Sequence, residues 1–248
     1  MAAIIDFLAF GAHPDDIELG CAGTLIKLAQ QGYRTAAITL TRGEAGTRGT
    51  PEIRRQEFDE AARLMQVSVH RQLDMPDAAI EETHANKLKL VRVIRELRPR
   101  LVATVHWETR HPDHLHTSNL VREAAMIAGL KNLPGAAGEP WRPYRVLFFP
   151  ERYEVEANFI VDVSTAFEQK MRAIRVHESQ FHGPNMAKYG DAQTVLTRPE
   201  FLEFIETKNR RWGAMIGAQY GEAFIVREAV RLDDPVAAFG EWCQDAVP

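Results

Sequence analysis

The stretch that decides the fold is Ile4-Ile5-Asp6-Phe7-Leu8-Ala9-Phe10, followed at once by Gly11-Ala12-His13-Pro14-Asp15-Asp16. Its first seven residues are a short, mainly apolar run with β-branched and aromatic side chains, which predicts a buried strand. Pro14 marks the end of that strand, because proline has no N–H group to donate to a neighbouring strand. Polar residues directly after a buried strand are typical of a site at the edge of an α/β sheet.

Strands and helices are expected to alternate along the rest of the chain. Further strands are predicted at residues 35–41, 101–105, 145–149 and 158–163, with a short strand and turn at 73–76. Helices are predicted at residues 23–31, 50–65, 85–97, 115–128, 164–177 and 199–215, and a surface loop at 129–143. This alternation indicates right-handed βαβ units and a mainly parallel sheet flanked by helices. The length fits a single domain over residues 1–248.

Composition excludes several classes of protein. A net charge of −4 argues against a broad nucleic-acid-binding surface, which needs a basic excess. The two cysteines, Cys21 and Cys243, form neither a disulfide framework nor a CxxC zinc pattern. The first ten residues lack the basic segment of a signal peptide, and no apolar run approaches the ~20 residues of a membrane span. We therefore expect a cytoplasmic protein.

Two polar clusters carry the candidate chemistry, and both follow a predicted strand. The first runs from His13 through Asp15 and Asp16 to Glu18, and the second is His111-Pro112-Asp113-His114. Zinc hydrolases need three protein ligands, an open position for water and a carboxylate beside that water. We assign His13, Asp16 and His114 as zinc ligands, with Fe²⁺ as the alternative ion for two histidines and one carboxylate.

The remaining members of the clusters are then free for catalysis. Asp15 is assigned as the general base, and His111 as the group that polarises the carbonyl oxygen or protonates the leaving amine. Asp113 is expected to orient an imidazole, that of His111. A dinucleotide site is rejected, because Gly11-Ala12-His13-Pro14-Asp15-Asp16 places two aspartates and a proline where G-x-G-x-x-G would cradle phosphate.

These two motifs resemble those of the PIG-L/LmbE family of zinc-dependent N-acetylglucosaminyl deacetylases. AHPDD at residues 12–16 is similar to the family's first metal motif, and HPDH at 111–114 to its second. The resemblance extends to about Glu222 and implies a Rossmann-like α/β fold. It also implies the same roles for the motif residues: ligands His13, Asp16 and His114, base Asp15, and His111 in acid or oxyanion roles. A homo-oligomer, such as a hexamer, is a further implication.

Secondary motifs resemble the subgroup that acts on N-acetylglucosaminyl-L-malate in bacillithiol biosynthesis. They are LTRGE at 40–44, GTRGT at 46–50 with Arg54 and Glu57, and SQF at 179–181. Arg54, Arg48, Arg110 and Gln180 are the candidate contacts for a small amino-sugar substrate. The alternatives are a thiol-conjugate amidase, a deacetylase of another N-acetyl amino sugar such as diacetylchitobiose, and a sugar-binding or metal-storing module without turnover.

Overall fold

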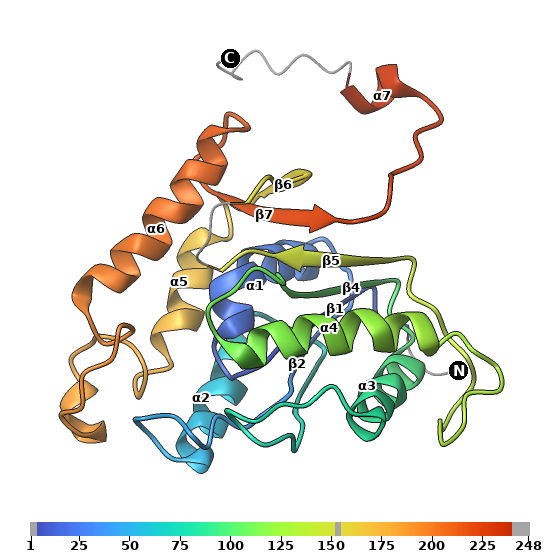
Figure 1. Ribbon diagram of the computed structural model, residues 1–248. Helices are drawn as coiled ribbons and strands as arrows, with labels where there is room; N and C mark the ends of the chain where they lie inside the picture. Colours follow the sequence, from blue (N-terminus) through green and yellow to red (C-terminus); the bar gives the residue numbers. More distant parts are fainter. Residues whose placement is uncertain (1–3, 152–154, 240–248) are drawn as a thin grey trace.

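Five parallel strands form the centre of the molecule (Figure 1). The computed structural model describes residues 4–151 and 155–239. The strands are β1 (Phe7–Gly11), β2 (Thr35–Thr39), β3 (Val69–Gln72), β4 (Leu101–Val105), β5 (Arg145–Phe149), β6 (Phe159–Asp162) and β7 (Gly221–Val226). Their order across the sheet is β3-β2-β1-β4-β5-β7-β6, and the pairings of β7 with β5 and β6 are antiparallel. The order β3-β2-β1-β4-β5 confirms the Rossmann-like α/β fold.

Helices cover both faces of this sheet (Figure 1). The helices are α1 (Asp16–Gln30), α2 (Pro51–Leu64), α3 (His84–Leu97), α4 (Pro112–Ile127), α5 (Phe167–Arg175), α6 (Pro199–Ala214) and α7 (Pro235–Phe239). Because side chains alternate along a strand, Leu8 and Phe10 pack with α3 and α4 in one core, whereas Phe7 and Ala9 pack with α1 and α2 in the other. A third cluster joins α5 to α6 through Phe167 and Phe201.

Two helices begin earlier than the sequence suggested. We expected helices from Gly23 and Leu115, but α1 begins at Asp16 and α4 at Pro112. Both polar motifs therefore extend into the first turn of a helix instead of remaining in loops. Gly20 is tolerated inside α1 because a Cβ atom there would lie 2.1 Å from the Phe149 ring, so only glycine permits this close approach of α1 to β5.

Other boundaries also differ from expectation. The strand expected at residues 73–76 is instead β3 at Val69–Gln72, and α5 is preceded by Ala166 and not capped by Ser164. β7 and α7 were not predicted at all. The strands at 101–105 and 145–149 are confirmed. Cys21 is a buried free thiol, and Cys243 lies outside the described residues. In the part of the chain that is described, no helix is long and apolar enough to cross a membrane.

Candidate metal and catalytic site

The two polar motifs meet where the strand order reverses. The chain passes from β1 to β2 on one side, and β4 lies on the other side of β1. In open α/β sheets such a switch point leaves a crevice at the carboxyl ends of the two central strands. The first motif follows β1 and the second follows β4, so the topology itself brings the two together.

One ring nitrogen of His13, one of His114 and both carboxylate oxygens of Asp16 converge at this point. Nδ1 of His13 lies 3.1 Å from Nε2 of His114. Asp16 Oδ2 lies 3.5 Å from the first nitrogen, and Asp16 Oδ1 lies 3.3 Å from the second. Ligand atoms about 2.0–2.2 Å from a tetrahedral zinc ion lie roughly 3.3–3.5 Å from one another. The expected ligand set is therefore brought together at spacings that suit one ion.

The other ring nitrogens face carboxylates. His13 Nε2 lies 3.0 Å from Asp77 and 3.2 Å from Asp113. His114 Nδ1 lies 2.6 Å from Glu151. A ring that donates to a carboxylate through one nitrogen presents the lone pair of the other. Nδ1 of His13 and Nε2 of His114 would then point lone pairs at each other, an arrangement that a cation between them stabilises.

Overlapping groups of donors surround the same point. Ligand atoms lie within 4.8 Å of one another in three further sets: His13, His111 and His114; His13, Asp77 and Asp113; and Asp16, His114 and Glu151. Asp77, Asp113 and Glu151 already contact the outer ring nitrogens. Nδ1 of His13, Nε2 of His114 and the Asp16 carboxylate are the donor atoms that remain between these rings.

The carboxylates of the cluster also favour positive charge on or between the two histidines. Although burial opposes it, the charges of Asp16 and Glu151 raise the pKa of His114 to about 10. Burial likewise opposes protonation of His13, yet the charge of Asp16 and hydrogen bonds with carboxylates raise its pKa well above the usual value. The carboxylates therefore create a strong local demand for positive charge, which protons or a metal ion would satisfy.

Asp15 lies beside these ligands and is held in an uncommon conformation. Its backbone φ is 119°, in the left-handed half of conformational space, where side chains other than glycine are strained. Its carboxylate is buried and lies 3.4 Å from the Arg54 guanidinium. Burial raises the pKa of Asp15 to about 7, against the opposing charge of Arg54. A carboxyl group with a pKa near neutrality suits proton transfer.

His111 presents a ring to the same centre. Its ring centroid lies 4.8 Å from that of His13 and 5.0 Å from that of His114. Its Nδ1 accepts a hydrogen bond from the backbone N–H of Asp113, so the neutral ring carries its proton on Nε2. Burial and the neighbouring charges of His13 and His114 lower its pKa, which favours that neutral form.

Asp113 orients a different ring from the one expected. Its carboxylate contacts His13 and accepts hydrogen bonds from the backbone N–H groups of Ala78 and Ile80. His111 is held by the backbone of Asp113 and not by its carboxylate. The reason is that Asp113 lies in the first turn of α4, where its side chain turns toward the loop after β3.

The glycine-rich loop after β2 surrounds Arg54. Its guanidinium donates to the carbonyls of Gly43 and Pro14 and faces Asp15. Gly43 has φ of +71°, which favours glycine, and a Cβ atom there would lie 2.0 Å from Arg54 Nη1, so any other residue would displace the guanidinium. Arg54 lines the pocket, but most of its polar contacts are with the protein itself.

The other expected substrate contacts divide into three cases. Arg48 does not line the pocket, because its buried guanidinium donates to the carbonyls of Ser179, Met186 and Ala192. Gln180 lines the pocket while donating to the Arg48 carbonyl and the Ser179 hydroxyl. Arg110 is exposed at the pocket mouth, so its guanidinium can meet a solute.

The pocket has a volume of about 460 Å³ and two kinds of wall. One wall carries the histidines and carboxylates described above. Apolar side chains also line the pocket: Leu19, Val195, Leu196, Phe201 and Ile205. Such a cavity is large enough for a small organic substrate held by a few convergent polar groups.

Sequence reasoning missed Asp77 and Glu151. The Asp77 carboxylate contacts His13 Nε2 and accepts a hydrogen bond from the backbone N–H of Ala45. Burial favours the protonated form of Asp77, but the hydrogen bond with His13 outweighs burial and lowers the pKa of Asp77 to about 2. Glu151 follows β5, as His13 follows β1. The signal that could have found them is the one used for His13, namely a polar residue beyond the carboxyl end of a strand.

Comparison with known proteins identifies the family. Residues 8–125 match the PIG-L family model, described as GlcNAc-PI de-N-acetylase. The diacetylchitobiose deacetylase of Thermococcus kodakarensis is 35% identical over 188 residues, which cover 70% of this chain and 69% of that protein. The structure of a conserved protein from Thermus thermophilus, TT1542, is 34% identical, with a TM-score of 0.83 over 92% of this chain and 97% of that one.

A structure with a named activity is also similar. The N,N'-diacetylchitobiose deacetylase from Pyrococcus horikoshii, complexed with its inhibitor MPG, is 27% identical, with a TM-score of 0.75 over 89% of this chain and 83% of that one. The family match covers both metal motifs, and the relatives extend the similarity over most of the chain. This chain belongs to the PIG-L family of deacetylases.

Proposed function

We propose that this protein is a metal-dependent hydrolase that removes the acetyl group from an N-acetylglucosaminyl conjugate, with residues 1–248 acting as one domain. The observation that carries the proposal is the convergence of His13, Asp16 and His114 at 3.1–3.5 Å, with Asp15 and His111 alongside. The relatives named as diacetylchitobiose deacetylases support this class of reaction.

The proposed cofactor is Zn²⁺, with Fe²⁺ as the alternative, held by His13, Asp16 and His114. When bound, such an ion polarises a carbonyl oxygen and lowers the pKa of water toward neutrality. Asp77 and Asp113 would hold the ring of His13, and Glu151 that of His114, each through the nitrogen that faces away from the ion.

The remaining chemistry falls to Asp15 and His111. Asp15 accepts a proton from the water whose oxygen attacks the acetyl carbon. The Nε2–H group of His111 donates to the carbonyl oxygen as negative charge develops on it. When the C–N bond breaks, the proton on Asp15 passes to the amine, leaving acetate and a free amino sugar, while the neutral His111 ring keeps its Nε2–H proton.

For the substrate we propose N-acetylglucosaminyl-L-malate, which would place the protein in bacillithiol biosynthesis. Arg110 supports an anionic aglycone, because it is exposed at the pocket mouth while Arg48 is committed to backbone carbonyls. Diacetylchitobiose is the second candidate, favoured by the names of two relatives. A thiol-conjugate amidase on the same site is the third.

We further propose a cytoplasmic homo-oligomer, such as a hexamer.

Acetate release from the acetylated sugars, and release of the free amine from the thiol-conjugate amide, test the proposal. The panel contains N-acetylglucosaminyl-L-malate, diacetylchitobiose and a thiol-conjugate amide, each with metal-stripped and with Zn²⁺- or Fe²⁺-loaded protein. Loaded protein should release acetate, and stripped protein should not. Arg110→Met should lower kcat/KM for the malate conjugate while leaving that for diacetylchitobiose unchanged.

Two variants separate metal binding from proton transfer. His13→Ala should abolish both stoichiometric metal and turnover, whereas Asp15→Ala should retain the metal and lose turnover. Near-wild-type turnover in Asp15→Ala would disprove its role as the base. Failure to release acetate from every acetylated glucosamine would favour a binding or metal-storage module instead.

A further inference from the structure

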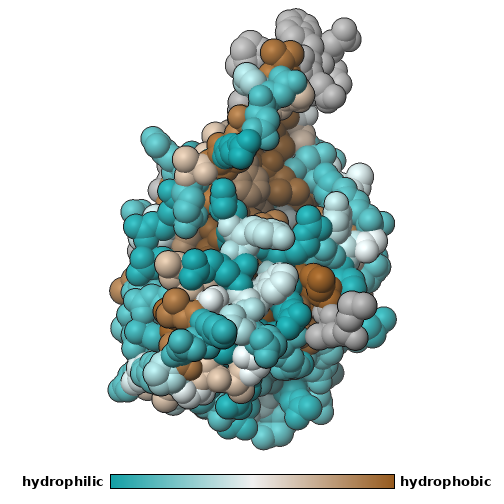
Figure 2. All heavy atoms as spheres, turned by 90° about the vertical axis from the view of Figure 1, so that its right-hand side faces the viewer, coloured by the Kyte–Doolittle hydropathy of each residue, from teal (hydrophilic) through white to brown (hydrophobic). Residues whose placement is uncertain are grey.

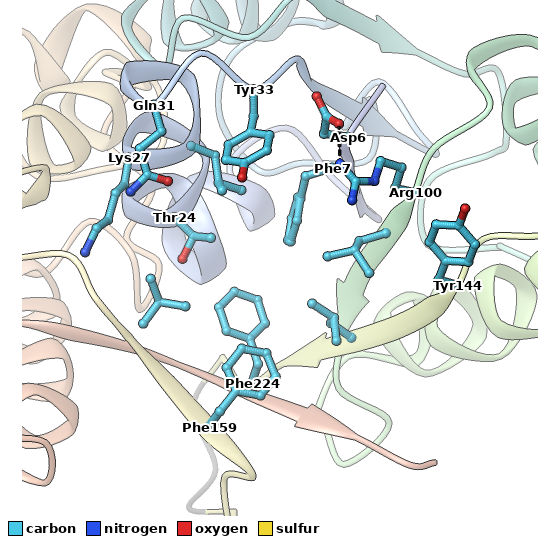
Figure 3. Close-up of a pocket in the computed structure, with 14 residues that line it drawn as sticks. Asp6, Phe7, Thr24, Lys27, Gln31, Tyr33, Arg100, Tyr144, Phe159 and Phe224 are labelled. Carbon is cyan, nitrogen blue, oxygen red and sulfur yellow. Dashed lines mark hydrogen bonds and ion pairs between the residues drawn. The ribbon is translucent and has the colours of Figure 1, made fainter. Parts of the chain in front are cut away.

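A second cavity lies at the opposite edge of the sheet from the metal motifs. It has a volume of about 460 Å³ and adjoins Phe7 and Leu101, the first residues of β1 and β4. In Figure 3, Tyr33 reaches toward it from one side, and Phe159 and Phe224 face it from β6 and β7 on the other. Leu28, Leu101, Leu147 and Val161 supply aliphatic wall, Thr24, Lys27 and Gln31 of α1 supply polar groups, and the Asp6–Arg100 ion pair also lines the cavity.

This cavity is suited to binding an apolar group and not to catalysis. None of the candidate metal-binding groups in the described chain includes a residue that lines it. Two large side chains at its rim are substantially exposed, Tyr144 at 65% and Phe159 at 39%. Exposed aromatic side chains around an apolar hollow indicate a surface that a partner covers.

The segment that follows β7 leaves the sheet beside this cavity. Val226, the last residue of β7, is in register with Leu147 of β5, and Leu147 lines the cavity. The following residues, 227–239, are here named the C-terminal arm. In Figure 1 the arm leaves the right-hand end of β7, at the same side as the start of β4, and rises away from the sheet to α7.

The arm carries apolar side chains that nothing in the described chain covers. Every described side chain from 227 to 238 is exposed. Val230 is 61% exposed, Leu232 46% and Val236 75%. Val230 and Leu232 alternate with Arg231 and Asp233, which pair with each other at 2.7 Å, so an extended arm has one apolar and one charged side.

The arm's hydrogen bonds do not fix it to the body either. Those found beyond Arg227 among the described residues are internal: Arg231 to Asp233, and the backbone N–H groups of Val236, Ala237 and Ala238 to Asp234. Arg227 alone reaches back, with its guanidinium 5.0 Å from the centre of the Trp107 ring. Figure 2 shows the arm as a projection with apolar surface beneath it.

We infer that the arm of one copy docks into this apolar cavity of a second copy, and that the exchange is reciprocal. No arm residue lines the cavity of its own copy, yet the arm begins next to Val226, which is paired with the cavity residue Leu147. In a twofold pair, each arm would therefore start next to the partner's cavity and meet it with Val230, Leu232 and Val236. Such a contact is self-complementary and closes at two copies. The inference does not depend on the proposed function, because the metal motifs lie at the other edge.

Complementation between two full-length variants tests this exchange. The arm variant carries Val230→Asp and Leu232→Asp and keeps its cavity. The cavity variant carries Tyr144→Asp and Phe159→Glu and keeps its arm. Met215→Asp is the matched control, because Met215 is 61% exposed at the end of α6 and lines neither of the two cavities. Sedimentation velocity over a concentration series gives the oligomeric state, and circular dichroism with urea unfolding shows that each variant is folded.

Wild type and the Met215→Asp control should associate, and each variant alone should lose both arm–cavity contacts. Mixing the two variants should restore one of the two contacts, because the cavity variant's intact arm meets the arm variant's intact cavity, so the mixture should associate more than either variant alone and less than wild type. Native mass spectrometry of the mixture, with one variant isotopically labelled, should show a one-to-one pair. Association of the arm variant equal to wild type, a wild type that stays monomeric, or a mixture no more associated than its parts would overturn the inference.

Discussion

Glu151 Oε2 lies 2.6 Å from Nδ1 of His114, so a residue after β5 orients a ring that belongs to the first turn of α4. This contact leaves Nε2 of His114 facing His13 and Asp16. Glu151 is half-buried, and the backbone carbonyl of the same residue accepts a hydrogen bond from Lys208. The metal site is therefore supported from α6 as well as from the two motifs that carry its ligands.

Glu151→Gln should weaken metal binding without unfolding the protein. The amide keeps the shape but loses the charge that favours a donating imidazole, and loss of such an outer partner typically costs about 10–100-fold in metal affinity. Competition titration of the metal-free protein with a chromophoric chelator measures this. Glu139→Gln, at an exposed position in the 129–143 loop, is the control and should leave the affinity unchanged. An unchanged affinity in Glu151→Gln would show that the contact has no influence on the ion.

The parts of the fold that were predictable are those with purely local signals. The strands at 101–105 and 145–149 are short apolar runs, as buried parallel strands should be. β7 was missed because Glu222 interrupts its pattern. Glu222 is buried, and it accepts hydrogen bonds from Gly23, Thr24 and Lys170. Partners so distant in the chain cannot be identified from periodicity.

In the candidate site, too, features with a local signal could be predicted, and contacts between distant segments could not. The convergence of His13, Asp16 and His114 could be predicted because strand ends meet at one edge of a parallel sheet. The position of Arg48 could not be predicted. Its guanidinium donates hydrogen bonds to backbone carbonyls within residues 179–192, and no local sequence pattern shows where that segment packs. Arginine spacing alone does not distinguish a substrate contact from a tether between two loops.

Asp15→Gly should be more stable than Asp15→Ala, although both lose turnover. Only glycine adopts a φ of 119° without strain, and such strain is worth on the order of 1–3 kcal/mol. Both variants lack the proposed base, which predicts a fall in kcat of about 10²–10⁴-fold. Urea unfolding of the two metal-free proteins isolates the backbone effect, because both lack the carboxylate. Equal free energies of unfolding would show that position 15 is not strained.

Gly43→Ala should lower both stability and turnover. Its Cβ atom would lie 2.0 Å from Arg54 Nη1 and displace the guanidinium that faces Asp15. Gly32→Ala is the matched control, because Gly32 also has a positive φ, +86°, but nothing lies within 4 Å of its added Cβ. The control should lose about 1 kcal/mol of stability and no turnover. If both variants retain wild-type kcat, the position of Arg54 has no part in the reaction.

Lys208 should make the stability of the metal-free protein rise with pH above neutrality. Burial, together with the charge of Lys170, lowers the pKa of Lys208 from 10.5 to about 7. Between pH 7 and 10.5 the unfolded chain therefore binds a proton at Lys208 that the folded chain has largely lost. The cost of burying Lys208 is fully present below pH 7 and disappears as the pH rises through this interval.

Lys208→Met should be more stable than wild type below pH 7, and its free energy of unfolding should rise less steeply with pH above 7. Urea unfolding across this range checks the prediction, with the exposed Lys131→Met as control. A wild-type slope in Lys208→Met would assign the pH dependence to another group.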